Sequence, residues 1–236
     1  MTEAIFRQQR NGLYAVNIVI PGGILTPEQF MGLAEVARDT GVWRIKCGIR
    51  QSLIVVLDQD KIPTLLEKIH ALGLQIAPFG NKIRSVKACP GGAELCPRSL
   101  GPALELGMEL QERYLGQDVP KDFKISTAGC PRGCTEPYCA DLGLIARGGD
   151  KFDVVIGGRG ATSKPMHGVK IASDVNKNKV FAVVDFVLAT YRAHAEPHER
   201  LCKTMARLGT TLFTPQLELY QAEEQAQDEF AAFLME

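Results

Sequence analysis

The stretch AGCPRGCTEPYC, residues 128–139, places the strongest constraint on this chain, because it holds three cysteines and two prolines within twelve positions. Thiols at this density serve a limited set of purposes: disulfides, zinc binding, an iron–sulfur cluster or nucleophilic chemistry. Each purpose requires its own spacing and its own cellular compartment. The rest of the sequence can therefore discriminate among them.

The start of the chain, MTEAIFRQQRNG, lacks the apolar core of a signal peptide, and no uninterrupted apolar run approaches bilayer-spanning length. We therefore expect a cytoplasmic protein with no membrane partner. Structural disulfides are rare in that compartment, and a total of seven cysteines is odd, which also counts against a complete disulfide framework. Basic and acidic residues balance at 27 each, so no global field favours nucleic acid. An anionic ligand must be met by a local cluster of cations.

Two of the cysteines, Cys47 and Cys202, stand alone among apolar neighbours, and we expect them to be core thiols. The other five form two groups: Cys89 with Cys96, and Cys130 with Cys134 and Cys139. We interpret Cys139 as a spare thiol that is buried and is not a ligand.

The spacing of the four remaining cysteines is C-x6-C, a gap of 33 residues, and then C-x3-C. Structural zinc sites favour two to four residues between paired thiolates, so the six-residue gap fits zinc poorly. A [4Fe–4S] cubane is larger, and wider and unequal spans can reach its corners. Prolines fix the chain after three of the cysteines, and nearby glycines allow the backbone to approach a bulky inorganic body. The cluster is the favoured interpretation, with zinc and reactive thiols as alternatives.

The first 78 residues show two helix patterns between strand patterns. Residues 13–20 read as a strand. Residues 26–41 carry a helix signature with Thr26 as N-cap, Gln29 completing a capping box and an apolar face that includes Phe30. Residues 43–57 are rich in β-formers, and alternation from Trp43 predicts an apolar row on one face and a basic row on the other. Residues 62–73 form a second helix pattern. This order suggests a ferredoxin-like α+β sandwich.

The pattern changes after residue 78. A short strand over 83–88 leads into the first cysteine pair, a helix follows from about 99 to 115, and a strand over 123–128 leads into the second pair. Further strands are expected at 141–146, 152–158 and 168–173, with helices at 180–194 and 198–209. We expect an acidic helical tail within 209–236.

Several motifs resemble the sirohaem- and [4Fe–4S]-containing sulfite and nitrite reductases. They are RSVKACPGGAELC followed by FKISTAGCPRGC, the strand IKCGIRQSL and the later strand FDVVIGGRG, in the family's order over roughly residues 12–208. Three departures stand out. The first cysteine pair has one extra residue, Asp122 replaces a commonly basic residue, and the chain carries one copy of a unit that larger members carry twice. The chain therefore resembles a compact single-repeat, low-molecular-weight, assimilatory-type sulfite reductase.

The resemblance implies an α+β fold in which a ferredoxin-like unit, residues 1–78, precedes a mixed α/β sirohaem and iron–sulfur domain, residues 79–208. It also implies two cofactors, sirohaem and a [4Fe–4S] cluster. The cluster ligands would be Cys89, Cys96, Cys130 and Cys134, with Cys134 bridging the cluster and the haem iron.

The anionic substrate and the sirohaem carboxylates both require cations. By motif position, the candidates for the substrate are Arg50, Arg84, Lys124 and, as a weaker candidate, Lys121. The candidates for holding the sirohaem are Arg44, Lys46, Lys87, Arg132, Gly157, Gly158 and Arg159. For each basic residue the alternative is an ordinary solvated surface charge.

The predicted reaction is the six-electron reduction of sulfite to sulfide, with nitrite reduction to ammonia as the alternative. Two alternative functions belong to other functional classes: an electron-transfer protein that holds only the cluster, and a zinc-stabilised binding module. GGRG lacks the spacing of a dinucleotide fingerprint, so we expect a separate electron-donor protein such as a ferredoxin or a flavoprotein. The oligomeric state stays open.

Overall fold

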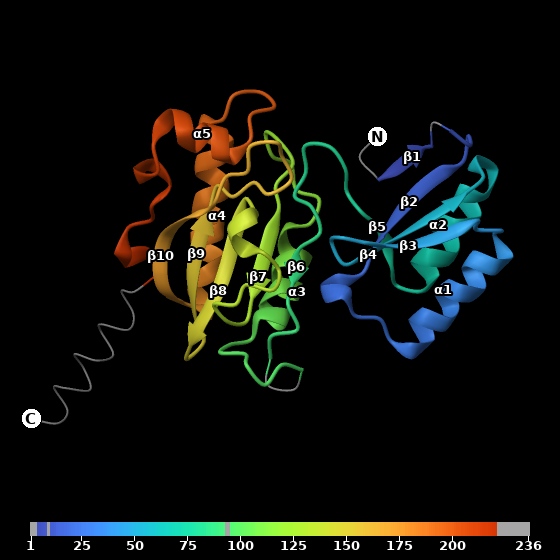
Figure 1. Ribbon diagram of the computed structural model, residues 1–236, viewed down its shortest axis with the longest axis horizontal. Coiled ribbons are helices and arrows are strands. Elements are labelled where there is room, and N and C mark those ends of the chain that lie inside the picture. Colours follow the sequence, from blue (N-terminus) through green and yellow to red (C-terminus); the bar gives the residue numbers. More distant parts are fainter. Residues whose placement is uncertain (1–3, 9, 93–94, 221–236) are drawn as a thin grey trace, which may run out of the picture.

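The computed structural model describes residues 4–8, 10–92 and 95–220. Within them the chain forms two β-sheets, each with its own helices, as Figure 1 shows. Each sheet also has its own hydrophobic core. The first sheet is built from residues up to Ile76, and the second from Lys87 onward.

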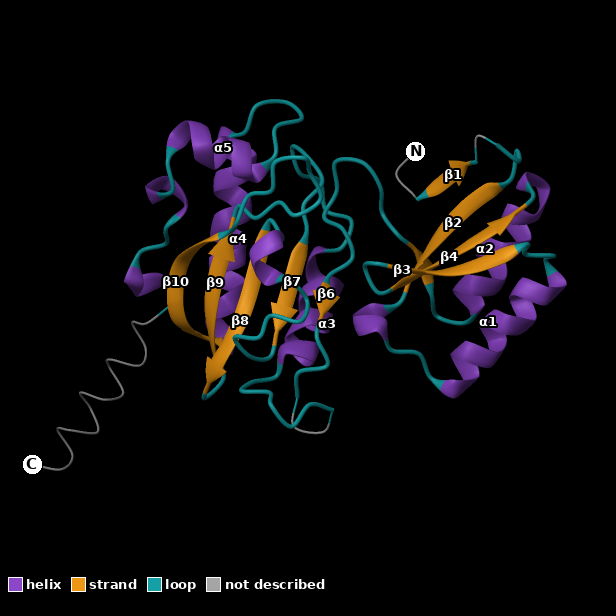
Figure 2. Cartoon of the chain, viewed as in Figure 1, coloured by secondary structure: helices purple, strands orange, loops and turns teal. Residues whose placement is uncertain are grey.

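The first sheet has the ferredoxin-like arrangement expected from the sequence. Its elements are β1 (Ile5–Arg7), β2 (Tyr14–Val19), a 3-10 turn at Pro21–Gly23, α1 (Pro27–Asp39), β3 (Arg44–Gly48), β4 (Ser52–Leu57), a 3-10 turn at Gln59–Lys61, α2 (Ile62–Ala71) and β5 (Gln75–Ile76). The strands are antiparallel in the order β1-β2-β4-β3, and β5 also pairs with β2. Both helices lie on one side of the sheet (Figure 2), where their apolar faces meet those of β2 and β4.

The capping signal in the sequence works as expected. The Thr26 hydroxyl accepts from the Gln29 amide N–H at 3.1 Å, and the Gln29 side chain accepts from the Thr26 amide at 3.1 Å. Both orphan donors at the start of α1 are thereby satisfied. Leu33, Val36 and Ala37 then bury the apolar face of the helix.

The prediction for the following strand was partly wrong. β3 is an edge strand whose side chains are mostly exposed, so the expected apolar row is not a core row, and Cys47 is exposed too. Phe30 of α1 is 66% exposed and does not belong to the buried face. The strand ends at Gly48, which places Arg50 in the hairpin turn and not on the basic face of the strand.

The second sheet mixes parallel and antiparallel strands in the order β10-β9-β8-β7-β6. Its strands are β6 (Lys87–Ala88), β7 (Ile125–Ala128), β8 (Leu142–Gly148), β9 (Lys151–Ile156) and β10 (Val169–Asn176). β6, β7 and β8 run parallel, whereas β9 and β10 complete the sheet by antiparallel pairing.

Two helices pack on this sheet: α3 (Ala103–Tyr114) contacts β6 and β7, and α4 (Lys177–His194) contacts β9 and β10. They meet where the Tyr114 hydroxyl donates to Asp185 at 2.7 Å. α3 begins later than predicted. The Ser99 hydroxyl donates to the Gly101 carbonyl at 2.7 Å instead of capping the helix, so residues 99–102 form a bend. A 3-10 turn at Pro137–Cys139 contacts β7, β8 and β9.

The last elements are α5 (Leu201–Leu208) and 3-10 turns at Thr211–Phe213 and Leu217–Leu219. The expected helical tail therefore begins with short 3-10 turns, and its residues 221–236 lie outside the described part of the chain. Tyr220 packs into the core of the second unit. None of the helices among the described residues has both the length and the apolar character needed to cross a membrane.

Candidate active site

Both cysteine pairs begin at one edge of the second sheet. Cys89 directly follows β6, and Gly129 and Cys130 directly follow β7. Because β6 and β7 are parallel neighbours, with Ala88 opposite Thr127, their carboxyl ends deliver the two cysteine-bearing loops to the same place. Open α/β sheets bind ligands at this edge for the same reason.

Cys89 sits in a close backbone cradle. Its Sγ accepts a hydrogen bond from the Gly129 amide at 3.0 Å. A Cβ on Gly91 would lie 2.9 Å from this sulfur and 2.7 Å from the Gly129 Cα, so only glycine fits there. Burial raises the pKa of the Cys89 thiol, and the nearby Cys134 and Cys130 thiols raise it further.

The second cysteine loop is fixed to β7 by side-chain hydrogen bonds. The Ser126 hydroxyl donates to the Thr135 carbonyl at 2.8 Å, and the Thr135 hydroxyl donates to the Thr127 carbonyl at 2.7 Å. The amide of Gly133 then closes a turn on the carbonyl of Cys130. The loop that carries two predicted ligands is thereby held against the rigid end of the sheet.

The cysteines differ in exposure. Cys89 is buried, Cys96 and Cys130 are half-buried, and Cys134 is exposed. Cys139 was expected to be buried, but it is exposed and lines a cavity. Among the described residues, no group of three or more His, Cys, Asp or Glu side chains surrounds a single metal-ion position. A [4Fe–4S] cluster takes one thiolate at each of four corners, so its ligands need not surround a single ion position.

A cavity of about 600 Å³ lies between the two units. The first unit contributes Asn17 and Ile54 from its open sheet face and the turn around Arg50. The second unit contributes Arg84 from the segment before β6, Lys87 of β6, the loop preceding β7, the loop after β9 and Arg200 just before α5. The basic residues that line the cavity are Arg50, Arg84, Lys87, Lys124, Arg159 and Arg200.

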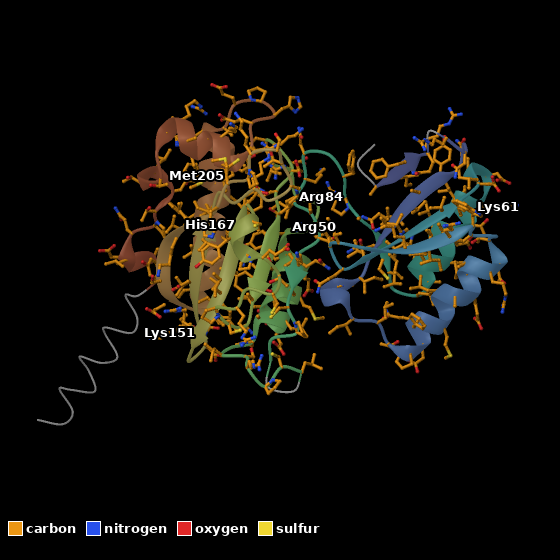
Figure 3. The ribbon with its side chains drawn as sticks, in the orientation of Figure 1. Arg50, Lys61, Arg84, Lys151, His167 and Met205 are labelled. Carbon is orange, nitrogen blue, oxygen red and sulfur yellow. The ribbon has the colours of Figure 1, made fainter. Side chains whose placement is uncertain are left out.

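The hairpin turn between β3 and β4 carries the first unit into the site. The Arg50 guanidinium donates to the Ser85 carbonyl at 3.2 Å, and the Gln51 side chain bonds to both the amide and the carbonyl of Ala88, at 2.8 and 2.6 Å. Gln51 adopts a left-handed φ of 51° to make this turn. Figure 3 shows Arg50 and Arg84 beside each other at the junction of the units.

Arg50, Arg84 and Lys124, the predicted substrate-binding cations, lie where burial disfavours their protonated forms. Burial and, to a smaller extent, the neighbouring Arg84 lower the pKa of Arg50 to about 10. Burial also lowers the pKa values of Arg84 and Lys124. Arg84 lies over the ring of Phe79, with its guanidinium carbon 5.2 Å from the ring centroid. An anion in this cavity would relieve the unfavourable concentration of positive charge.

Sequence reasoning missed Arg200, which precedes α5. Its side chain is only 13% exposed and forms ion pairs with Asp122 at 3.0 Å and with Asp141 at 2.9 Å. Burial raises the pKa of Asp141 to about 6, although Arg200 acts to lower it. Because Arg200 pairs with Asp122, this carboxylate does not place an unpaired negative charge in the site. No local motif marks Arg200, because its partners lie 59 and 78 residues away in sequence.

The predicted sirohaem-binding residues are not all in one place. Lys87 and Arg159 line the cavity; Lys87 pairs with Glu136 at 2.7 Å, and the Arg159 Nε is buried without a hydrogen-bond partner among the described residues. Three other predicted sirohaem cations, Arg44, Lys46 and Arg132, lie outside the cavity lining, as does the weaker substrate candidate Lys121. Gly157 and Gly158 also lie outside it, where a Cβ would meet Met205 or the Tyr138 carbonyl.

Family comparisons match both units. Residues 7–72 match the nitrite/sulfite reductase ferredoxin-like half domain, and residues 79–224 match the nitrite and sulphite reductase 4Fe-4S domain. The chain belongs to the nitrite and sulfite reductase family. The comparisons confirm the expected α+β fold class. They also confirm the expected cofactors, sirohaem and a [4Fe–4S] cluster.

The relatives of this chain differ in length. A nitrite reductase [NAD(P)H] of Neurospora crassa is 30% identical over 85% of this chain and 17% of its own length. An assimilatory-type sulfite reductase of Nitratidesulfovibrio vulgaris is 28% identical over 85% of this chain and 91% of its own length. The chain thus spans about a fifth of the first curated relatives.

The fold also has a solved counterpart. The crystal structure of dissimilatory sulfite reductase I superposes with a TM-score of 0.78 at 14% identity, covering 88% of this chain and 68% of that chain. At this identity the likeness concerns the fold alone.

Proposed function

We propose that this family member reduces sulfite to sulfide with sirohaem and a [4Fe–4S] cluster. The observation that carries the proposal is the cavity between the units, which six basic residues line, together with the two cysteine pairs that begin at the carboxyl ends of the neighbouring strands β6 and β7. A carrier with a cluster alone would not require such a cavity. The family match makes a zinc-stabilised module a poor alternative.

The residues fit both cofactors. Gly91 and Gly129 let the backbone pack closely around the Cys89 sulfur without side-chain atoms, and thiolates are the ligands that such clusters take. We assign Cys89, Cys96, Cys130 and Cys134 as the cluster ligands, with Cys134 shared with the haem iron. The buried Nε atoms of Arg159 and Arg200, which lack partners among the described residues, suit the carboxylates of a sirohaem.

The protein residues have separate roles in this proposal. Arg50 and Arg84 hold the anion from opposite units, and Lys124 donates a proton to an oxygen that departs as water. Sirohaem, when bound, supplies an iron that takes the substrate and transfers electrons to it. Lys87 and Arg159 hold its carboxylates. Lys121, Arg44, Lys46, Arg132 and the Gly157–Gly158 pair are weaker candidates, because they do not line the cavity.

Sulfite is the first candidate because the motifs of this chain resemble those of a compact, assimilatory-type sulfite reductase. A sulfite reductase of that type and nitrite reductases are both similar to this chain. Their similar identities, 28% and 30%, keep nitrite reduction to ammonia as the second candidate. We further propose a separate electron-donor protein, a reducing cytoplasmic location, and the division into units 1–78, 79–208 and a tail 209–236.

The test is to purify the protein with both cofactors, record its absorption spectrum, and measure reduction of sulfite and of nitrite with a reduced viologen dye as donor. We expect sirohaem bands together with cluster absorbance, and a higher kcat/KM for sulfite. A higher value for nitrite would select the second candidate. Cluster absorbance without sirohaem bands would reject both and favour an electron carrier.

A further inference from the structure

Arg200 and Lys124 share the same two carboxylates. Arg200 donates to both Asp122 oxygens, at 3.0 and 3.2 Å, and to Asp141 Oδ2 at 2.9 Å. The Lys124 backbone amide donates to that same Asp141 oxygen at 3.0 Å, and its Nζ lies 3.6 Å from Asp122 Oδ2. The closer contacts commit Asp122 to Arg200, which leaves the Lys124 ammonium weakly paired at the cavity.

We propose that Arg200 is a positioning residue for Lys124: by occupying Asp122 and Asp141 it directs the Lys124 ammonium into the cavity and promotes release of its proton. The inference deepens the proposed function, on which the proton-donor role of Lys124 rests. In that step the N–H bond of the ammonium breaks and the proton joins an oxygen of the bound anion. The neutral amine then regains a proton from water.

The charges around Lys124 act in opposite directions. Burial lowers its pKa most, Arg200 lowers it next, and Arg50 from the hairpin turn lowers it slightly, whereas Asp122 and Asp141 raise it. These groups come from the turn after β3, the loop before β7, the loop before β8 and the start of α5. Loss of Arg200 would remove a repelling cation and also free Asp122 to pair with Lys124. Loss of the Asp122 charge would remove an attracting carboxylate and would therefore lower the pKa of Lys124.

Loss of Arg200 and loss of the Asp122 charge should shift the pKa of Lys124 in opposite directions. This difference can be tested without cofactor and without turnover. Cofactor-free wild type, Arg200→Gln and Asp122→Asn are labelled with acetic anhydride from neutral to alkaline pH, and mass spectrometry measures acetylation of Lys124 relative to Lys61, an exposed reference. We expect the midpoint for Lys124 to rise by about one pH unit in Arg200→Gln and to fall in Asp122→Asn, because a charge within a few ångströms shifts a pKa by roughly that amount. Arg200→Lys should stay near wild type.

Midpoints that stay unchanged, or that move in the same direction in both variants, would overturn the inference. Asp122→Asn keeps the Arg200–Asp141 pair, so it decides the matter even if Arg200→Gln does not fold. The pH profile of kcat for the cofactor-loaded enzyme then separates the two proposals. If the labelling midpoints move as expected while the alkaline limb of kcat stays fixed, Arg200 positions Lys124, and the proton-donor role is wrong.

Discussion

The two sheets of the molecule differ in how they are buried. Every position of β7 is buried, whereas four of the five positions of β3 are exposed. The second sheet has helices α3 and α4 packed on it and the Pro137–Cys139 turn against three of its strands, but the first has both helices on one side (Figure 2). The cysteine loops leave the buried sheet. The first unit reaches the site through a hairpin turn and a few residues of its open face.

This difference assigns separate tasks to the units. The second unit supplies a rigid sheet edge with the predicted cluster ligands, and the first closes the cavity and adds Arg50. Substitutions of the predicted cysteine ligands in the second unit should therefore affect cofactor content. Substitutions in the first should affect substrate binding or stability and leave the cofactors in place.

The largest effect is expected from Cys130→Ser. Removal of one thiolate corner should reduce iron and acid-labile sulfide after reconstitution to a small fraction of the wild-type content. Cys139→Ser in the same loop and Cys47→Ser in the first unit are the controls and should retain the cluster. Iron that survives in Cys130→Ser and is lost in Cys139→Ser would contradict the ligand assignment.

The next effect compares the units directly, through Arg50→Ala in the first and Arg84→Ala in the second. Loss of a charge-assisted hydrogen bond to the anion costs roughly 1.5–3 kcal/mol. We therefore expect kcat/KM for sulfite to fall about ten- to hundredfold in each variant, with both cofactors retained. Arg84→Lys should recover part of the loss, since an ammonium cannot reproduce a planar guanidinium.

The controls for this pair are Lys61→Ala and Lys68→Ala, which remove exposed charges just before α2 and in its last turn. Figure 3 places Lys61 far from Arg50 and Arg84. Equal losses in the controls would mean that overall charge governs turnover. Normal kinetics in both arginine variants would place the substrate elsewhere.

A smaller effect is expected at the contact between the units. Gln51→Gly removes the two hydrogen bonds to Ala88 without straining the left-handed backbone at this position. Leaving these backbone groups of buried Ala88 unpaired should lower the free energy of unfolding by roughly 1–3 kcal/mol, measured by urea titration. Gln51→Glu can still accept from the Ala88 amide but cannot donate to its carbonyl, so it should lose at least the second bond. Unchanged stability in Gln51→Gly would mean that other contacts join the units.

The smallest effect is expected from Thr26→Ala, which removes the capping box of α1. Loss of an N-cap costs about 1 kcal/mol, so a modest drop in the urea midpoint should appear with normal iron content. Thr64→Ala on the exposed side of α2 is the matched control. A loss of cofactor in Thr26→Ala would break the separation between the units.

The sequence by itself determined the local features of this protein. The capping box at Thr26, the end of α2 before Gly73 and the strand leading to Cys130 follow from short-range patterns, and the structure contains all of them. The two cysteine pairs and the motifs around them indicated the family, which the comparisons confirm. Short-range signals suffice where backbone hydrogen bonding and turn geometry decide the conformation.

Only the tertiary structure decided which side chains meet. Alternation in residues 43–50 predicted an apolar row on one face of the strand, but β3 lies at the edge of its sheet and that row is exposed. Arg50 reaches the cavity because β3 ends at Gly48 and the hairpin turn follows, and Cys139 is exposed because its turn borders the cavity. Arg200 joins Asp122 across 78 residues of sequence, since the packing of α5 brings them together. Such contacts depend on how whole elements pack, and no local pattern encodes that.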